Sequence, residues 1–276
     1  MKITPLQQEM LDKESAFEKE GKFHDHVQPI NWDVVLPVTP EYNFLPKTLG
    51  FTLWSAFIRM VVNTFAPVID WFACGTTVRG RENLKGIRRA VVTCNHVHDL
   101  DNMMVRQAIR GWRHSLYITV ADFNSRKDLI GHIMRGGGTL PFSQSITAMR
   151  NLNKAVQTVL SKDRYLLCFP EGTLWWRYEK VRPFLDGAFH YASESSVPVI
   201  PTFITFKKAG PIRRLFSKKK VAVIHIMPAI YPKKEFTKKQ NIAYLRDRAF
   251  EETKECYEAF YGKPLEYNGE PVLVDE

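Results

Sequence analysis

The sequence predicts a single α/β domain with a mixed, mostly parallel sheet flanked by helices, preceded by an N-terminal arm and amphipathic apolar helices. Two observations support this fold class. Short apolar, β-branched runs alternate with longer amphipathic stretches along the chain, which is typical of α/β architecture. Polar motifs follow directly after two of these runs, where ligands bind in an open α/β sheet. The 276 residues suffice for one sizeable domain with an appendage.

The chain divides into three parts by composition. Residues 1–47 read as an N-terminal helix and extended arm, 48–75 as apolar membrane-associating helices, and 76–276 as the main domain. The formal net charge of +10 suggests nucleic acid, an anionic membrane surface or acidic ligands as partners. The basic clusters of the last third lack interleaved stacking aromatics, so we expect no nucleic acid and favour an anionic membrane or an acidic carrier protein.

The N-terminus and the cysteines both indicate a cytoplasmic protein. The first residues lack the apolar core of a signal peptide. The four cysteines show no metal-ligand spacing, so we expect buried, reduced thiols.

The first element is a helix from Thr4 to about Glu20. Thr4 is suited as the N-cap, Pro5 as the first helical residue and Gln7 as the partner in a capping box. Gly21 ends the helix, and a proline-punctuated arm follows. His24 and His26 lie at its start, but no third ligand is nearby, so we expect no metal there.

Residues 51–73 are apolar and aromatic, yet their polar residues fall in one stripe at helical period. Pro67 is expected to kink or divide this helix. Arg59 and Asp70 would make a lipid-exposed span costly. Two interpretations stay open and are compatible: a helical hairpin packed on the domain, or an interfacial element with its aromatic residues among lipid headgroups. The stripe comprises Thr52, Ser55, Arg59, Asn63 and Asp70, and the aromatic residues are Trp54, Phe57, Trp71 and Phe72.

The main domain is expected to alternate strands and helices. The strands are predicted at 76–81, 90–94, 116–120, 139–142, 165–169, 197–206 (broken by Pro198 and Pro201) and 221–227. The helices are predicted at 103–112, 127–134 (ended by the glycine run 136–138), 148–160, 184–193 and 237–261. The helix 148–160 is amphipathic, with one apolar face made of Ala148, Leu152, Ala155, Val156 and Val159.

The first polar motif follows the strand at residue 90. His96 and Asp101 are separated by four residues, so a turn lets the carboxylate reach one imidazole nitrogen and leave the other free. Such a pair fixes the tautomer and stabilises the imidazolium that forms when the histidine accepts a proton. The stretch offers no nucleophile apart from Cys94, which should point into the sheet. His96 is therefore a candidate base for a hydroxyl that the substrate supplies.

The second motif, Glu171-Gly172-Thr173, follows the strand at residue 165. Glycine lets the backbone approach a ligand closely, and exposed N–H groups can hold an oxyanion or a phosphate. By itself this loop is a weak signal. Its combination with the His96 motif is specific.

The two motifs resemble those of the glycerolipid acyltransferase family, typified by 1-acylglycerol-3-phosphate acyltransferases. Asn95, His96 and Asp101 match the family's first motif, and Phe169 to Thr173 match the third, Phe-Pro-Glu-Gly-Thr. The proline-containing strand 197–201 is similar to the fourth motif, and Gly138 to Gln144 meets the second in part. The resemblance covers residues 76–206.

The resemblance implies acyl transfer from a thioester, either acyl-CoA or acyl carrier protein, to an alcohol of a lysophospholipid, 1-acylglycerol 3-phosphate. His96 would be the general base, and Asp101 would orient it. Glu171, Gly172, Thr173, Gln144 and Arg177 are the candidate substrate-binding residues. No metal, cofactor or covalent acyl-enzyme is implied. The protein would associate peripherally with the inner face of the cell membrane.

Departures from the family pattern leave alternatives open. Gln144 and Leu174 stand where the family often has arginines associated with the acceptor phosphate, so a glycolipid or another lysolipid is the alternative acceptor. Arg177, Arg182 or Arg135 could replace those arginines. A metal-dependent hydrolase that uses His96 and His98 is a more distant alternative, because the His-x-His-x-Asp-His pattern of that class is not met.

Overall fold

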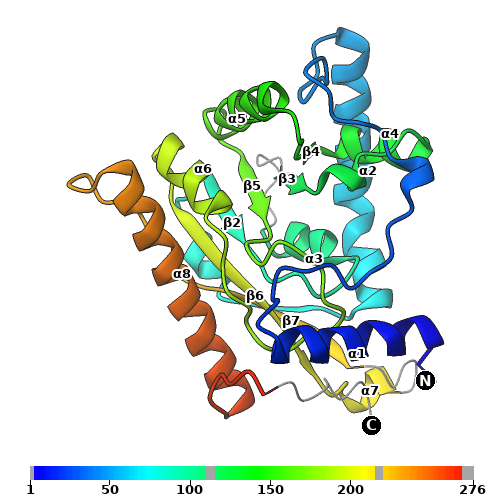
Figure 1. The fold of residues 1–276 in the computed structure, drawn as a ribbon, viewed down its shortest axis with the longest axis vertical. Coiled ribbons are helices and arrows are strands. Elements are labelled where there is room, and N and C mark those ends of the chain that lie inside the picture. The colour runs from blue at the N-terminus through cyan, green and yellow to red at the C-terminus, as the bar shows by residue number, and fades with distance from the viewer. Residues whose placement is uncertain (1–2, 110–115, 215–219, 269–276) are drawn as a thin grey trace.

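The computed structural model describes residues 3–109, 116–214 and 220–268. Their strands form a seven-stranded mixed sheet in the order β1-β7-β6-β2-β5-β3-β4 (Figure 1). The strands are β1 (Thr77–Arg79), β2 (Ala90–Thr93), β3 (Leu116–Val120), β4 (Thr139–Pro141), β5 (Tyr165–Cys168), β6 (Val199–Lys207) and β7 (Val221–Ile226). All neighbouring strands pair in parallel except β6 and β7. The predicted fold class is confirmed.

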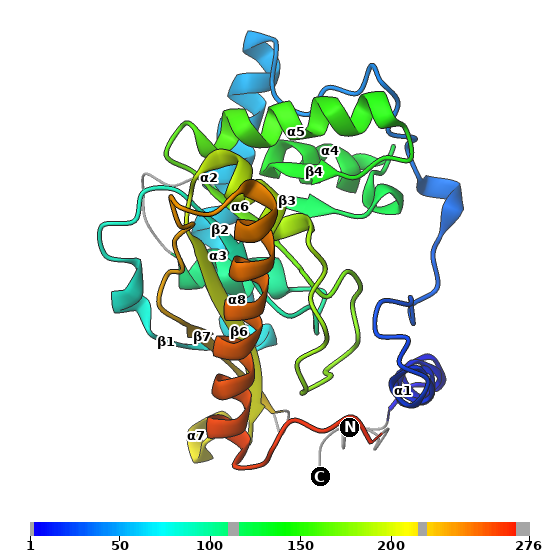
Figure 2. The ribbon, with the colours of Figure 1, turned by 60° about the vertical axis from the view of Figure 1, so that its left-hand side comes forward.

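Helices cover both faces of the sheet (Figures 1 and 2). They are α1 (Pro5–Lys19), α2 (Leu49–Ala73), α3 (Asp101–Ala108), α4 (Leu129–Gly137), α5 (Ile146–Leu160), α6 (Gly187–Ser195), α7 (Pro211–Arg214) and α8 (Lys238–Tyr261), with three short 3-10 turns at Trp32–Val34, Arg81–Leu84 and Asp122–Asn124. Residues 110–112 of the predicted helix 103–112, and Lys218 and Lys219 of the basic clusters, lie outside the described residues.

Alternation along β2 divides the core into two layers. Ala90 and Val92 contact a cluster that includes α3, whereas Val91 contacts a cluster that includes α5, α6 and α8. Successive strand residues point to opposite faces, so a strand that is apolar throughout becomes buried on both sides. The buried face predicted for α5 is also the observed one, from Ala148 to Val159.

Three local expectations were wrong, and the first concerns β6. The strand runs without a break through Pro201. Side chains supply bonds between β2 and β6 here: the Thr202 hydroxyl donates to the Thr93 carbonyl at 2.7 Å, and the Asn95 amide bonds both the N–H and the C=O of Ile204. These bonds support the pairing where proline lacks a donor.

The second concerns the helix at Pro67, and the third concerns the glycine run. Pro67 lies inside one continuous helix α2, so it does not divide the helix, whereas the expected kink stays a prediction. Helix α4 continues to Gly137 and ends at Gly138, which has a φ of +98°. A Cβ on Gly136 would lie 3.0 Å from Trp54 Nε1, so this glycine allows α4 to pack closely on α2.

The N-terminal helix has the predicted start and end. Thr4 and Gln7 form the capping box of α1, and Glu20 is the C-cap. The arm that follows runs beside the domain to the start of α2 (Figure 2). It bonds to the domain through its backbone, because Leu36 donates to the Ser125 carbonyl at 2.6 Å.

Candidate active site

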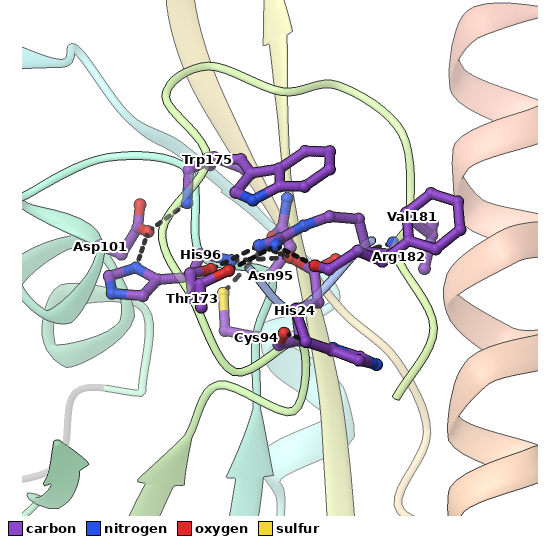
Figure 3. Close-up of polar contacts among 12 residues, drawn as sticks. His24, Cys94, Asn95, His96, Asp101, Thr173, Trp175, Val181 and Arg182 are labelled. Atoms are coloured by element: carbon purple, nitrogen blue, oxygen red, sulfur yellow. Dashed lines mark hydrogen bonds and ion pairs between the residues drawn. The ribbon is translucent and has the colours of Figure 1, made fainter. Parts of the chain in front are cut away.

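The site lies at the carboxyl edge of β2 and β5, which are neighbours in the sheet. His96 follows β2, and Asp101 is the first residue of α3. His96 Nδ1 lies 2.9 Å from Asp101 Oδ2 (Figure 3). The same carboxylate oxygen accepts the backbone N–H groups of Val97 at 2.7 Å and His98 at 3.0 Å. The carboxylate thus holds Nδ1 protonated and leaves Nε2 as the basic nitrogen.

His96 and Asp101 differ in their exposure to solvent. Asp101 is fully buried, whereas 24% of the His96 side chain is exposed. The imidazole stacks on the Phe169 ring with 4.0 Å between centroids and 14° between planes. Phe169 and Asp101 therefore fix both the plane and the rotation of the imidazole.

A second buried carboxylate supports the first motif from behind. Glu171 Oε2 accepts the backbone N–H of His96 at 3.2 Å and pairs with Arg182 Nη2 at 2.8 Å. Its other oxygen accepts the backbone N–H of Arg182 at 3.0 Å. Both Glu171 and Arg182 are fully buried. Glu171 therefore ties the loop after β5 to the loop after β2, and its contact with substrate stays a prediction.

Arg182 connects the two motifs to the N-terminal arm. Its Nη1 donates to the Phe23 carbonyl at 2.8 Å and to the Thr173 hydroxyl at 2.9 Å (Figure 3). The guanidinium also lies 4.6 Å from the centre of the Trp175 ring. The sequence suggested Arg182 only as a possible phosphate ligand. A buried glutamate needs a buried cation, and this requirement is the signal that could have identified the pair.

His96 opens into a cavity of about 530 Å³. Gly172 and Thr173 line it, as predicted for a substrate-binding loop. Gly172 has a φ of +86°, and a Cβ there would lie 3.0 Å from Leu185, so the loop requires glycine. The arm forms another wall through residues 28–31 and His26, whose pKa is lowered by burial.

Three predicted substrate-binding residues, Glu171, Gln144 and Arg177, are not among the described residues that line this cavity. The Gln144 amide donates to Asp122 at 3.0 Å. The Arg177 guanidinium lies over the rings of Trp176 and Phe206, and its Nη2 donates to the Lys220 carbonyl at 3.4 Å. Among the described residues that line the cavity, the arginines are Arg106 and Arg126, which the sequence did not single out.

Other chemistry has less support in the geometry. The His98 ring accepts the backbone N–H of Leu100 at 3.1 Å, so it is engaged within its own turn. In the part of the chain that the structure describes, no three His, Cys, Asp or Glu side chains are grouped to hold a metal ion. Burial raises the pKa of Cys168 in the cavity wall to about 12 and raises that of Cys94, so both remain thiols near neutral pH.

Helix α2 packs on α3 and α4 at the side of the domain (Figure 1). Its polar stripe faces inward: Ser55 and Asp70 are buried, and Arg59 donates to the Tyr117 hydroxyl at 2.7 Å. The rest of the helix exposes apolar residues, and it is long and apolar enough to cross a membrane by length and composition. The expected helical hairpin is therefore wrong, since the segment is one helix with a protein-facing and an outward face. Its position among lipid headgroups stays a prediction.

The fold and the site are those of an α/β domain with a histidine–aspartate pair at the edge of its sheet. The model of the Acyltransferase family matches residues 75–205. The chain is 30% identical over 131 residues to the 1-acyl-sn-glycerol-3-phosphate acyltransferase of Saccharomyces cerevisiae, an alignment that covers 46% of this chain and 42% of the yeast protein. It is 25% identical over 209 residues to the human 1-acyl-sn-glycerol-3-phosphate acyltransferase alpha, which covers 63% of this chain and 72% of the human protein.

A solved structure supports the fold. The crystal structure of the 1-acyl-sn-glycerophosphate acyltransferase PlsC from Thermotoga maritima superposes with a TM-score of 0.55 at 15% identity, covering 92% of this chain and 96% of that one. These findings confirm the resemblance predicted from the two motifs. Residues 75–205 match the Acyltransferase family model, and the yeast and human relatives carry acyltransferase names.

Proposed function

We propose that this protein transfers a fatty acyl chain from a thioester, acyl-CoA or acyl carrier protein, to a hydroxyl of a glycerolipid. The proposed acceptor is 1-acylglycerol 3-phosphate, the substrate in the names of the yeast and human relatives. One observation carries the proposal: an imidazole oriented by a buried carboxylate opens into a cavity at the sheet edge. This is the arrangement of a general base for a hydroxyl.

The mechanism follows from the positions of the two nitrogens. His96 Nε2 takes the proton of the acceptor hydroxyl as its oxygen attacks the thioester carbonyl. A C–O bond forms, and the tetrahedral intermediate collapses with cleavage of the C–S bond. The imidazolium returns its proton to the departing thiolate. Asp101 stabilises the imidazolium between these two transfers. The reaction draws on the thioester as cosubstrate and on no resident cofactor or metal.

Helix α2 supports a peripheral position at the inner face of the cell membrane. Its outward face is apolar, and the neighbouring α4 also exposes Leu129 and Ile130. The Arg213 guanidinium donates to the carbonyls of Trp71 and Phe72, so a basic segment lies at the end of the apolar helix. Apolar insertion beside cationic side chains is the combination that anchors proteins on anionic bilayers.

A different acceptor is the second candidate, because the arginines proposed to bind the acceptor's phosphate do not face the cavity at His96. The three arginines considered as phosphate ligands are engaged elsewhere: Arg182 with Glu171, Arg177 with Lys220, and Arg135 with the Arg126 carbonyl at 2.8 Å. A glycolipid or another lysolipid would need no such ligand.

The deciding experiment is mass spectrometry of the products formed by the full-length protein. CoA and carrier-protein thioesters are offered against glycerol 3-phosphate, 1-acylglycerol 3-phosphate, other lysophospholipids and a glycolipid. We expect acylated 1-acylglycerol 3-phosphate, and we expect His96→Ala to abolish it because the substitution removes the proposed general base.

His98→Asn is the matched control, since an asparagine oxygen can still accept the Leu100 N–H, and it should keep most of the activity. Transfer only to an uncharged acceptor would replace the substrate and keep the mechanism. Undiminished transfer by His96→Ala would overturn the mechanism.

A further inference from the structure

A second cavity, of about 1160 Å³, lies between α2, α3, the start of β3 and the end of α5. Four cationic side chains line it, and none of its described lining residues is an aspartate or glutamate. The cations are Arg59, Arg106, Lys162 and Arg164. Lining of one sign in a partly buried space is costly unless a ligand supplies the opposite charge.

Three of these cations are arginines, and two of them converge on one hydroxyl. Arg59 Nη2 and Arg164 Nη1 lie 2.7 and 2.8 Å from the Tyr117 oxygen. The guanidinium of Arg59 also lies 4.3 Å from the centre of the Tyr117 ring. A phenol hydroxyl carries no negative charge, so it does not neutralise either guanidinium group.

Arg106 completes the cluster from the α3 side. Only 9% of it is exposed, and its bonds within the described residues go to neutral groups, Asn63 Oδ1 and the Gly137 carbonyl, each at 3.3 Å. Burial and the neighbouring Arg59 lower the pKa of Arg106 to about 10. A buried arginine paired with no carboxylate is unusual, because burial of a charge requires a counter-charge.

Ser55 is an independent sign of a missing ligand. Its side chain belongs to the inward stripe of α2, lines the same cavity and is buried. Its Oγ has no hydrogen-bond partner in the described structure. Buried hydroxyls normally find a partner, so this one is available to a group that enters the cavity.

We infer that this cavity binds a phosphate ester, held by Arg59, Arg106 and Arg164. Planar guanidinium groups match the oxygens of a phosphate in pairs, and three of them suit the charge of a phosphate better than the single charge of a halide or an isolated carboxylate. The volume exceeds that of a bare ion and accommodates the organic part of an ester.

The position of the second cavity relative to His96 limits which phosphate ester can occupy it. It contacts the start of β3, at Leu116 and Tyr117, whereas the catalytic cavity contacts residues 118–121 at the other end. At 3.3 Å per residue the two ends of β3 are about 13 Å apart. Arg106 lines both cavities, so they meet along α3. Arg59 and Arg164 line only the second cavity, so a phosphate held between them is too far away to belong to the acceptor, whose phosphate is only a few bonds from its reacting hydroxyl.

Two sources can place a phosphate in the second cavity, away from the reacting hydroxyl. One is the thioester donor, whose phosphates lie at the far end of its pantetheine arm. The other is the headgroup of a membrane phospholipid in contact with α2. The inference rests on the proposed function only for the first source.

The test measures binding to the full-length protein by calorimetry, in the His96→Ala background, so that no turnover is needed. The probes are free CoA, vesicles of phosphatidylglycerol or of phosphatidylcholine, and orthophosphate. Arg59→Gln, Arg106→Gln and Arg164→Gln are compared with Arg150→Gln, which removes an exposed arginine of α5.

We expect each cavity variant to weaken the binding of one phosphate ester about tenfold, and Arg150→Gln to leave it unchanged. Loss for CoA alone identifies the donor's phosphates, and loss for the anionic vesicles alone identifies a lipid headgroup. Ligand-free Arg106→Gln should melt no lower than the parent, because it removes an uncompensated charge. A purely structural arginine would lower the melting temperature instead.

Unchanged binding of both esters in all three variants, or binding of orthophosphate only, would overturn the inference. Arg59 and Arg164 are less buried than Arg106, so their variants keep the test decisive if Arg106→Gln does not fold. Absence of acyl transfer together with arginine-dependent binding would refute the proposed function and leave this site standing.

Discussion

The two buried carboxylates of the site are neutralised in different ways. Glu171 pairs with the permanent cation of Arg182. Asp101 receives two backbone N–H groups and the His96 ring, and it sits at the N-terminus of α3, where the helix dipole favours a negative charge. Its one described ion-pair partner is a histidine that can gain and lose a proton. In the proposed mechanism Asp101 would therefore favour the imidazolium, while Glu171 holds the two loops together.

The substitution Asp101→Asn tests this division at the residue scale. An asparagine oxygen can still accept the N–H groups of Val97 and His98, so the fold should persist. The neutral amide no longer stabilises the imidazolium, and we expect kcat to fall about 10³- to 10⁴-fold, as in hydrolase triads. Steady-state kinetics with a thermal melt of the same sample measures both effects. A stable variant with near-normal kcat would contradict the role of Asp101.

His225 contributes to the pH dependence of the free energy of unfolding below neutral pH. Burial, with a smaller effect of Arg79, lowers its pKa to about 4. An unfolded histidine titrates near 6.5, so between these pH values the unfolded chain binds a proton that the folded chain does not. The free energy of unfolding therefore falls as the pH falls from about 6.5 toward 4.

Replacement of His225 by glutamine should remove this contribution, since glutamine can still bond the Thr205 hydroxyl, which lies 2.9 Å from the histidine. Denaturant unfolding at pH 7 and pH 4.5 should show that the parent loses about 2 kcal/mol more than the variant. Other groups titrate equally in both proteins and cancel. Equal losses would show that His225 is not the group responsible.

At the scale of elements, α1 acts as a strap on the loop that follows β5. Glu14 accepts the Trp176 N–H, and Glu18 accepts the Tyr178 hydroxyl at 2.9 Å and pairs with Lys180 at 2.7 Å. Both glutamates are buried. The same loop holds Thr173, which lines the cavity at His96, so α1 stabilises the wall of this cavity from 160 to 162 residues away in sequence.

Removal of the Glu18 carboxylate should loosen this strap. Glu18→Ala leaves Lys180 without its buried ion-pair partner, which costs about 3–5 kcal/mol of unfolding free energy. Glu9→Ala is the matched control on the same helix, because the Glu9–Lys13 pair is exposed and should cost less than about 1 kcal/mol. Denaturant titration compares the two variants. Similar small losses in both would show that α1 does not support the loop.

At the scale of the whole molecule, one surface is suited to lipid. Helices α2 and α4 pack together and expose apolar side chains beside the catalytic cavity, whose lining includes Ile133 and Met134 of α4. A lipid substrate that leaves a bilayer at this surface would enter the cavity without crossing water.

The triple substitution of Phe57, Phe65 and Phe72 by serine tests this surface. All three are more than half exposed, so their loss should not disturb the core. Each loses roughly 1 kcal/mol of insertion energy, and vesicle flotation should show about hundredfold weaker binding. Tyr231→Ser, an exposed aromatic between β7 and α8, is the control and should bind normally. Normal binding by the triple variant would exclude α2 as the anchor.

The sequence by itself determined the elements with strong local signals. The capping box of α1, the amphipathic face of α5 and the apolar strands β2 and β5 depend on neighbouring residues and period, so they could be predicted within a few residues. The His96–Asp101 pair is also local, because a four-residue separation needs only one turn. The resemblance to acyltransferases followed from the same two short motifs.

Only the tertiary structure decided the features that join distant segments. The Glu171–Arg182 pair, the strap from Glu18 to Lys180 and the arginine cluster around Tyr117 each depend on which faces meet across the sheet. The uninterrupted β6 and α4 belong to the same group. Proline and glycine weaken an isolated element, but the Asn95 amide and the close packing of α2 compensate in the folded chain. Such compensation comes from long-range contacts, which local sequence patterns do not encode.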